Sequence, residues 1–223
     1  MKKALNSLVH ILPMLVFAFS ATGCNAVMPD RIIGSNPEQE YGDNNYMQWA
    51  RETLAAIDRD LRIDGTDSYY ENQDRTQVSF IWGNIFLQYT YAEGAGLRAD
   101  EWKGALMSCY QNLERHWSPD YKGIAGYCTL PVTAGTPDRY YDENGWMAIG
   151  LARAYEQTGD RTYLEKARQA LNFTMSGEDD VLGGGIYFQE TFAQYEPQKN
   201  KICSEVAILE LSLIHIYEPT RLL

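Results

Sequence analysis

The hydrophobic positions of residues 46–211 follow a helical period, and the width of the apolar face alternates along the chain. Apolar residues recur every three to four positions in one-faced amphipathic helices predicted at 46–62, 100–116 and 160–173. Helices that are apolar on nearly all sides are predicted between and after them, at 78–92, 145–155 and 203–211. Two layers of helices explain this alternation, because only inner helices are covered on both sides.

The alternation predicts an all-α fold in which helical hairpins build part of an α/α toroid. An irregular all-α domain is the alternative. In a toroid all inner helices run the same way, so the loops that lead into them gather at one end. Two long segments, 117–141 and 176–200, are expected at that end, where function is usually found. The glycine run 183–185 and the residues after it predict a small β-hairpin within the second segment.

The first 24 residues are typical of a bacterial lipoprotein signal peptide. Lys2 and Lys3 precede an apolar run over 8–19, which is too short to cross a membrane. Small residues before Cys24 resemble a lipobox, which predicts lipidation of Cys24; a plain secretory signal is the alternative. We therefore expect an extracytoplasmic, membrane-anchored lipoprotein of the outer membrane or cell surface, with residues 25–44 as a flexible tether and 45–210 as the domain.

Composition and charge narrow the class of ligand. The net charge of −11 and the lack of a later basic cluster argue against nucleic acid. An aromatic content of 13% suits a neutral or polar ligand such as a sugar, because aromatic rings stack on sugar C–H faces. We expect a monomer. We expect no cofactor and no metal, since the sequence has no Cys/His cluster of the kind that binds zinc. A disulfide between Cys109 and Cys128 is one possibility. The other is that Cys109, Cys128 and Cys203 are all buried free thiols, and the sequence does not decide between the two.

Two adjacent carboxylates, Asp142 and Glu143, are the candidate catalytic residues. They stand at the start of a predicted inner helix, between Tyr141 and Trp146. A retaining glycosidase needs two carboxyl groups about 5–5.5 Å apart. The proximity of two like charges raises one pKa, while the helix dipole favours the ionised form of the other. From spacing alone, capping of the helix is the preferred interpretation of the pair.

The neighbouring motifs resemble glycoside hydrolase family 76, which comprises endo-α-1,6-mannanases and related enzymes. Its Tyr-Asp-Asp-Asn-x-Trp run, Thr-Gly-Asp helix end, glycine run and Lys-Asn pair have counterparts, in order, at 141–146, 158–160, 183–188 and 199–201. The resemblance is weaker over 46–117. It implies an (α/α)6 barrel that hydrolyses α-1,6-linked mannan or a related glycan by a retaining double displacement. It also implies that Asp142 is the nucleophile and Glu143 the acid/base.

Two departures from the family pattern concern the same region. Glu143 stands where the family has Asp, and Tyr187-Phe188 stands where it has Trp-Trp. The candidate substrate-binding residues are Tyr140, Tyr141, Asn144, Trp146, Gly184, Tyr187 and Asp74. Core packing is the alternative for Trp146 and Trp82. The alternative functions are a non-catalytic glycan-binding surface lipoprotein on the same fold, or another α/α-toroid carbohydrate enzyme such as an epimerase.

Residues 211–223 break the helical pattern and closely resemble translated sequencing-adapter DNA, which predicts a non-native tail. A helix continuation that ends at Pro219 is the alternative. Six predicted helices then make about half of the implied ring. We expect such a truncated domain, taken alone, not to form a stable active monomer.

Overall fold

The computed structural model describes residues 45–132, 138–180 and 184–190. The helices of these residues are α4 (Asn45–Leu61), α5 (Ile81–Leu97), α6 (Ala99–Leu113), α7 (Tyr141–Thr158) and α8 (Arg161–Met175). Shorter elements lie between α6 and α7: η1 (Glu114–His116), β1 (Trp117–Ser118), η2 (Tyr121–Gly123) and β2 (Gly126–Tyr127). The predicted signal peptide, tether, sixth helix, Lys-Asn pair and tail lie outside the described residues.

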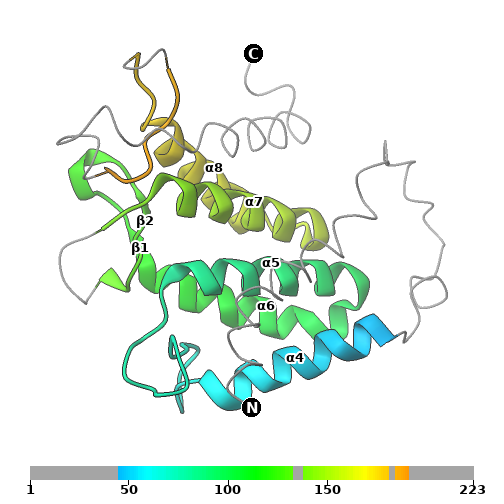
Figure 1. Ribbon diagram of the computed structural model, residues 1–223. Helices are drawn as coiled ribbons and strands as arrows, with labels where there is room; N and C mark the ends of the chain where they lie inside the picture. The colour runs from blue at the N-terminus through cyan, green and yellow to red at the C-terminus, as the bar shows by residue number, and fades with distance from the viewer. Residues whose placement is uncertain (1–44, 133–137, 181–183, 191–223) are drawn as a thin grey trace.

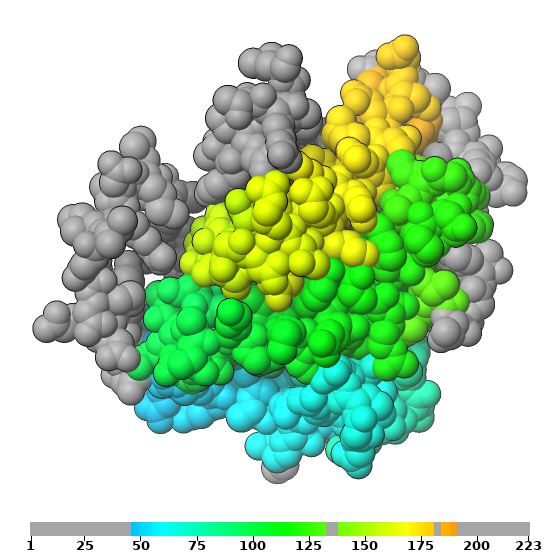
Figure 2. All heavy atoms as spheres, turned by 180° about the vertical axis from the view of Figure 1, so that it is seen from behind, coloured from blue at the N-terminus to red at the C-terminus, as the bar shows by residue number. Residues whose placement is uncertain are grey.

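The helices form two layers. Helices α5 and α7 pack against each other, α6 packs on α5, and α8 packs on α7. Figure 1 shows that α5 and α7 run in one direction, whereas α4, α6 and α8 run in the opposite direction. Seen from behind in Figure 2, α4, α6 and α8 follow one another across the outer surface. The predicted alternation of outer and inner helices is thus confirmed.

The burial of each helix explains its place in the layers. On α5 most side chains from Ile81 to Ala95 are buried, whereas α6 and α8 bury one stripe each, as predicted. The amphipathic pattern at 46–62 placed Tyr46 and Trp49 on the apolar side of the first helix, and this was wrong, because these side chains of α4 are 64% and 54% exposed. The core positions of α4 are Met47, Ala50 and Leu54, which share another side of the helix at spacings of three and four residues.

A tight turn joins the inner helix α7 to the outer helix α8. Gly159 ends α7 with φ 70°, a left-handed conformation that favours glycine. Asp160 begins α8, and its side chain accepts a 2.9 Å hydrogen bond from the Thr162 N–H. The turn reverses the chain, so that α8 returns toward the end of the molecule at which α7 starts (Figure 1).

The long connections lie together at that end of the molecule, as predicted (Figure 1). β1 and β2 pair antiparallel there, with Trp117 opposite Tyr127. At the glycine run, the predicted hairpin is reduced to one isolated antiparallel bridge between Glu178 and Ile186. Gly184 and Gly185, just before Ile186, have φ 106° and 92°, which only glycine adopts easily. The described two-stranded sheet instead lies before α7, in the segment 117–141, for which the sequence predicted a long loop and no strand.

Cys109 and Cys128 are buried free thiols, so the disulfide considered between them was wrong. Burial raises the pKa of Cys128 to about 11 and that of Cys109 further, which keeps both thiols protonated. Among the described helices, none has the length and apolarity needed to cross a membrane.

Candidate active site at the start of helix α7

The first turn of α7 carries both predicted catalytic carboxylates, and the backbone before it is held in an extended conformation. The Tyr141 N–H donates to the Phe188 carbonyl at 3.0 Å, and the Glu190 N–H donates to the Arg139 carbonyl at 3.0 Å. An antiparallel bridge joins Tyr140 to Gln189 between these two bonds. The segment that follows the glycine run therefore fixes the direction from which the chain enters α7.

Asn144 attaches the first turn of α7 to strand β2. Its Oδ1 accepts from the Tyr127 N–H at 2.7 Å, and its Nδ2 donates to the carbonyls of Tyr127 at 2.9 Å and Tyr140 at 2.8 Å. The side chain is completely buried. Its amide group is engaged by the backbone, which gives Asn144 a supporting role at the first turn of α7, and its contact with substrate stays a prediction.

Glu143 is the more buried of the two carboxylates, with 7% of its surface exposed. The Thr129 hydroxyl donates to its Oε2 at 2.9 Å. Burial raises the pKa of Glu143 to about 8; the charges of Asp142 and Asp138 act in the same direction, and the Thr129 hydrogen bond opposes them. A carboxyl group of that pKa is largely protonated near neutral pH, which is the form a general acid requires.

Asp142 lies in a more polar setting. It is partly exposed, and its Oδ1 accepts the Glu143 N–H at 2.8 Å. Burial raises its pKa, and hydrogen bonds from backbone N–H groups, including that of Glu143, oppose the rise. The sequence argument took the proximity of two like charges as the main cause of the pKa shift. In the structure burial is the largest cause of the raised pKa at both residues. Burial is more complete at Glu143, so the two carboxyl groups are suited to different roles.

A buried ion pair that the sequence did not reveal holds the surrounding loops together. The fully buried guanidinium of Arg139 donates to both carboxylate oxygens of Glu190, at 3.0 and 2.6 Å. It also donates to the carbonyls of Ile124 at 2.6 Å and Tyr121 at 3.1 Å. The ring of Phe173 lies 4.5 Å from the guanidinium carbon. Arg139 thereby joins the loop before α7, helix α8 and the segment 184–190.

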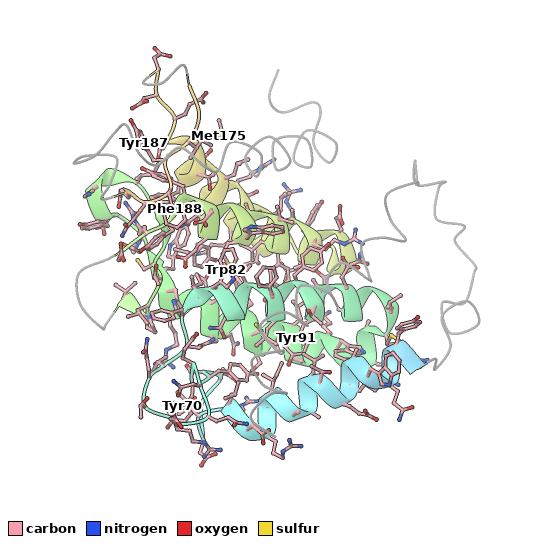
Figure 3. The ribbon with its side chains drawn as sticks, in the orientation of Figure 1. Tyr70, Trp82, Tyr91, Met175, Tyr187 and Phe188 are labelled. Carbon is pink, nitrogen blue, oxygen red and sulfur yellow. The ribbon has the colours of Figure 1, made fainter. Side chains whose placement is uncertain are left out.

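Two of the aromatic residues predicted to bind substrate are core residues. Tyr141 is buried and stacks on Phe173, with ring centroids 4.9 Å apart and an interplanar angle of 18°. Tyr187 is buried in the same cluster, and its hydroxyl donates to Asp179 Oδ2 at 2.7 Å. Figure 3 shows Tyr187 and Phe188 at the end of the molecule where α7 begins. Both tyrosines are therefore placed to support the site, and contact with substrate stays a prediction for them.

Partly exposed aromatic rings lie on the inner helices beside the carboxylates. Trp146 is one helical turn after Asp142 and remains partly exposed. Its ring is 5.8 Å from that of Phe86, which in turn is 5.4 Å from Trp82 on α5. Trp82 is 39% exposed and is labelled in Figure 3. The structure thus brings Trp146 and Trp82 together and leaves part of each ring open to a ligand.

The remaining predicted substrate-binding residues, Tyr140, Gly184 and Asp74, lie in three different segments of the chain. Tyr140 is partly exposed and packs edge-on against Phe188 at 5.1 Å. Gly184 lies two residues before Ile186, which forms the bridge to Glu178. Asp74 is exposed in the loop between α4 and α5, and no hydrogen bond or ion pair described for residues 45–132 joins it to the α7 carboxylates. A contact between Asp74 and substrate stays a prediction.

The described residues hold no group of three His, Cys, Asp or Glu side chains that could bind a metal ion. The buried His116 serves the backbone instead. Its Nδ1 lies 3.0 Å from the Cys128 carbonyl, and burial lowers its pKa to about 4, so the ring is neutral at neutral pH. In the tautomer that fits this distance, Nδ1 carries the proton and donates to the carbonyl.

Comparison with known proteins gives this geometry a family context. No protein-family model matches the sequence. A glycoside hydrolase family 76 α-mannanase from Bacteroides thetaiotaomicron, whose structure is solved, is 58% identical, with a TM-score of 0.75 over 83% of this chain and 52% of that one. The chain resembles family 76 α-mannanases. The architecture described above is accordingly a partial α/α toroid.

More distant relatives share the fold. The family 76 α-1,6-mannanase of Salegentibacter sp. HEL1_6 is 20% identical, with a TM-score of 0.60 over 83% of this chain and 52% of its own. An inactive variant of that enzyme, with two consecutive aspartates replaced by asparagine, is solved in complex with α-1,6-mannotriose. The meiotically up-regulated gene 191 protein of Schizosaccharomyces pombe is 26% identical over 118 residues, 51% of this chain and 26% of that protein. The chain thus spans about half the length of the solved relatives and a quarter of the curated one.

Proposed function

We propose that the protein is a retaining glycosidase that hydrolyses α-1,6-linked mannan or a related glycan at Asp142 and Glu143. The observation that carries the proposal is the pair of adjacent carboxyl groups in unlike environments at one end of the inner helices. Glu143 is buried and protonated near neutral pH, whereas Asp142 is partly exposed and accepts a backbone N–H. The similarity to family 76 α-mannanases supports the choice of substrate.

The chemistry follows from these environments. In the first step the carboxylate of Asp142 attacks the anomeric carbon, while Glu143 donates its proton to the glycosidic oxygen as the bond to the leaving sugar breaks. In the second step the ionised Glu143 removes a proton from water, which attacks the same carbon and releases Asp142. The partly exposed rings of Trp146 and Trp82 offer stacking faces for neighbouring sugar units.

The proposal is tested by the release of oligosaccharides from α-1,6-mannan by the full-length protein. Asp142→Asn and Glu143→Gln should each lower kcat/KM at least about 100-fold, because the first removes the nucleophile and the second removes the group that transfers the proton in both steps. Asp180→Asn, an exposed carboxylate beyond α8, is the matched control and should leave turnover unchanged. Nuclear magnetic resonance of the first product should show the α anomer. Equal turnover by wild type and Asp142→Asn, or a first product of inverted configuration, would reject the assignment.

The second candidate is a glycan-binding protein that does not turn over its ligand. The observation that favours it is Glu143 itself, which is one methylene longer than the family aspartate and has one carboxyl oxygen engaged by Thr129. Calorimetric binding of mannotetraose to wild type, with no reducing sugar formed after prolonged incubation, would select this alternative over hydrolysis.

We further propose that the protein acts as a monomer outside the cytoplasm and is held to a membrane through lipid on Cys24. The apolar run before Cys24 and the small residues next to it support this location. Metabolic labelling with a fatty acid should mark wild type and not Cys24→Ser; label on both proteins would exclude lipidation at this position.

A further inference from the structure

Thr129 lies in the loop between β2 and α7, and its hydroxyl makes a 2.9 Å hydrogen bond to Glu143 Oε2. A hydroxyl can accept as well as donate, but an ionised carboxylate can only accept. The Thr129 hydroxyl must therefore donate whenever Glu143 is charged. The same donor orientation also fits the neutral acid, provided that the acidic proton is on the other oxygen, Oε1.

The backbone of Thr129 is fixed on both sides, so its hydroxyl has a defined position. The Thr129 N–H donates to the Asp138 carbonyl at 2.9 Å, and its carbonyl accepts the Ile81 N–H at 2.8 Å at the start of α5. The preceding residue, Cys128, exchanges hydrogen bonds with His116 through its N–H at 2.8 Å and its carbonyl at 3.0 Å. Thr129 thus links the start of one inner helix to the carboxyl group on the next.

We propose that Thr129 is the positioning residue of the acid/base, which holds Oε2 of Glu143 and leaves Oε1 to transfer the proton. The inference rests on the proposed function. In the first step the Oε1 proton moves to the glycosidic oxygen as its bond to the anomeric carbon breaks. In the second, Oε1 takes a proton from water as the oxygen of that water bonds to the anomeric carbon and the bond to Asp142 breaks. Throughout both steps Oε2 keeps the Thr129 hydrogen bond.

Among the groups that shift the pKa of Glu143, the Thr129 hydroxyl favours the ionised form, whereas burial and the neighbouring charges favour the neutral form. Asp142 and Asp138 raise the pKa of Glu143 by their charge, and Tyr140 and Cys128 are the other titratable groups coupled to it. A hydrogen bond donated to the ionised form lowers a pKa, so its removal must raise the pKa further. Thr129 therefore adjusts the pH range in which Glu143 works as well as its orientation.

The test compares Thr129→Val, which keeps the shape and removes the hydroxyl, with Thr129→Ser, which keeps the hydroxyl. In the full-length protein Thr129→Val should lower kcat on α-1,6-mannan about 10-fold with little change in KM, and should move the alkaline limb of the pH profile upward by about 0.5–1 pH unit. Thr129→Ser should restore both. Thr90→Val is the control, because the buried Thr90 hydroxyl donates to the Phe86 carbonyl within its own helix α5.

Two further measurements separate this inference from the proposed function. With an aryl mannoside whose leaving group needs no protonation, the effect of Thr129→Val on the first step should disappear. An infrared titration of the Glu143 carboxyl, assigned by its loss in Glu143→Gln, should show a higher pKa in Thr129→Val whether or not the protein turns over mannan. A folded Thr129→Val protein with the wild-type pH profile and carboxyl titration would overturn the inference, while a wild type without turnover would overturn only the proposed function.

Discussion

At the scale of single residues, the buried carboxyl of Glu143 couples stability to pH. Its pKa is about 8 in the folded protein, against about 4.3 in an unfolded chain. The folded state therefore holds a proton that the unfolded state releases, and the resulting stability is complete below pH 4.3 and is lost as pH rises through 8. Glu143→Gln removes this loss, so we expect the variant to be more stable than wild type at pH 9 by about 2–4 kcal/mol.

Denaturant unfolding at pH 5, 7 and 9 measures this difference. The advantage of Glu143→Gln should be smallest at pH 5 and grow with pH. Glu178→Gln, which changes an exposed carboxylate, is the control and should follow wild type at each pH. A Glu143→Gln protein whose stability falls with pH as steeply as that of wild type would show that Glu143 is not the group that titrates.

Residue positions were predictable where a local pattern marks them. Asp142 and Glu143 stood out because adjacent carboxylates at a helix start are visible in the sequence. Arg139 and Thr129 did not, because their partners Glu190 and Glu143 lie 51 and 14 positions away, and no periodicity links them. Asn144 was identified as functional, but its amide serves Tyr127, a contact that depends on how β2 meets α7.

At the scale of helices, two glycines inside neighbouring helices should respond oppositely to the same substitution. A Cβ on Gly94 of α5 would lie 2.7 Å from the indole ring of Trp102 on α6, so Gly94→Ala forces the helices apart and should cost about 1–3 kcal/mol. A Cβ on Gly104 of α6 would meet nothing within 4 Å. Gly104→Ala should therefore stabilise by about 0.5–1 kcal/mol through the lower entropy of its unfolded chain.

The midpoints of thermal or urea unfolding test both glycine substitutions against wild type. Each variant is the control for the other, since both place alanine inside an α-helix. Equal effects of the two would mean that helix propensity alone decides the outcome and that the approach of α5 to α6 at Trp102 is not close.

The periodicity predicted which segments are helical, but it did not give the start of α7 or the short strands β1 and β2. α7 begins at Tyr141, four positions before the predicted start, because the apolar pattern begins at Gly145 while the polar first turn is already helical. Asp142 accepts the Glu143 N–H there, which satisfies one of the free donors of a helix start. The β1–β2 pair was missed since two-residue strands are too short to show alternation.

At the scale of the whole molecule, arginines that pair with carboxylates lie at both ends of the inner layer. Arg139 pairs with Glu190 among the loops that surround the start of α7. Arg153, near the other end of α7, pairs with Glu93 of α5 and Glu156 of its own helix. The inner helices α5 and α7 both start at the end that carries the candidate site, and the Arg153–Glu93 ion pair joins them near the other end.

This arrangement predicts that substitutions of the two arginines affect stability and activity differently. Arg139→Met leaves the buried Glu190 with the more distant Lys122, 4.0 Å away, and should destabilise by about 3–5 kcal/mol. Arg153→Met should cost less, about 1–3 kcal/mol, because Arg153 is partly exposed and water screens its pairs.

At a temperature where both variants remain folded, only Arg139→Met should lower kcat on α-1,6-mannan and shift its pH profile, since only Arg139 supports the segment that positions Asp142 and Glu143. Circular dichroism and mannan hydrolysis on the same samples provide the measurement. A loss of activity in Arg153→Met as large as that in Arg139→Met would mean that the packing of α5 on α7 along its whole length sets the geometry of the carboxylates, rather than the loops at their end.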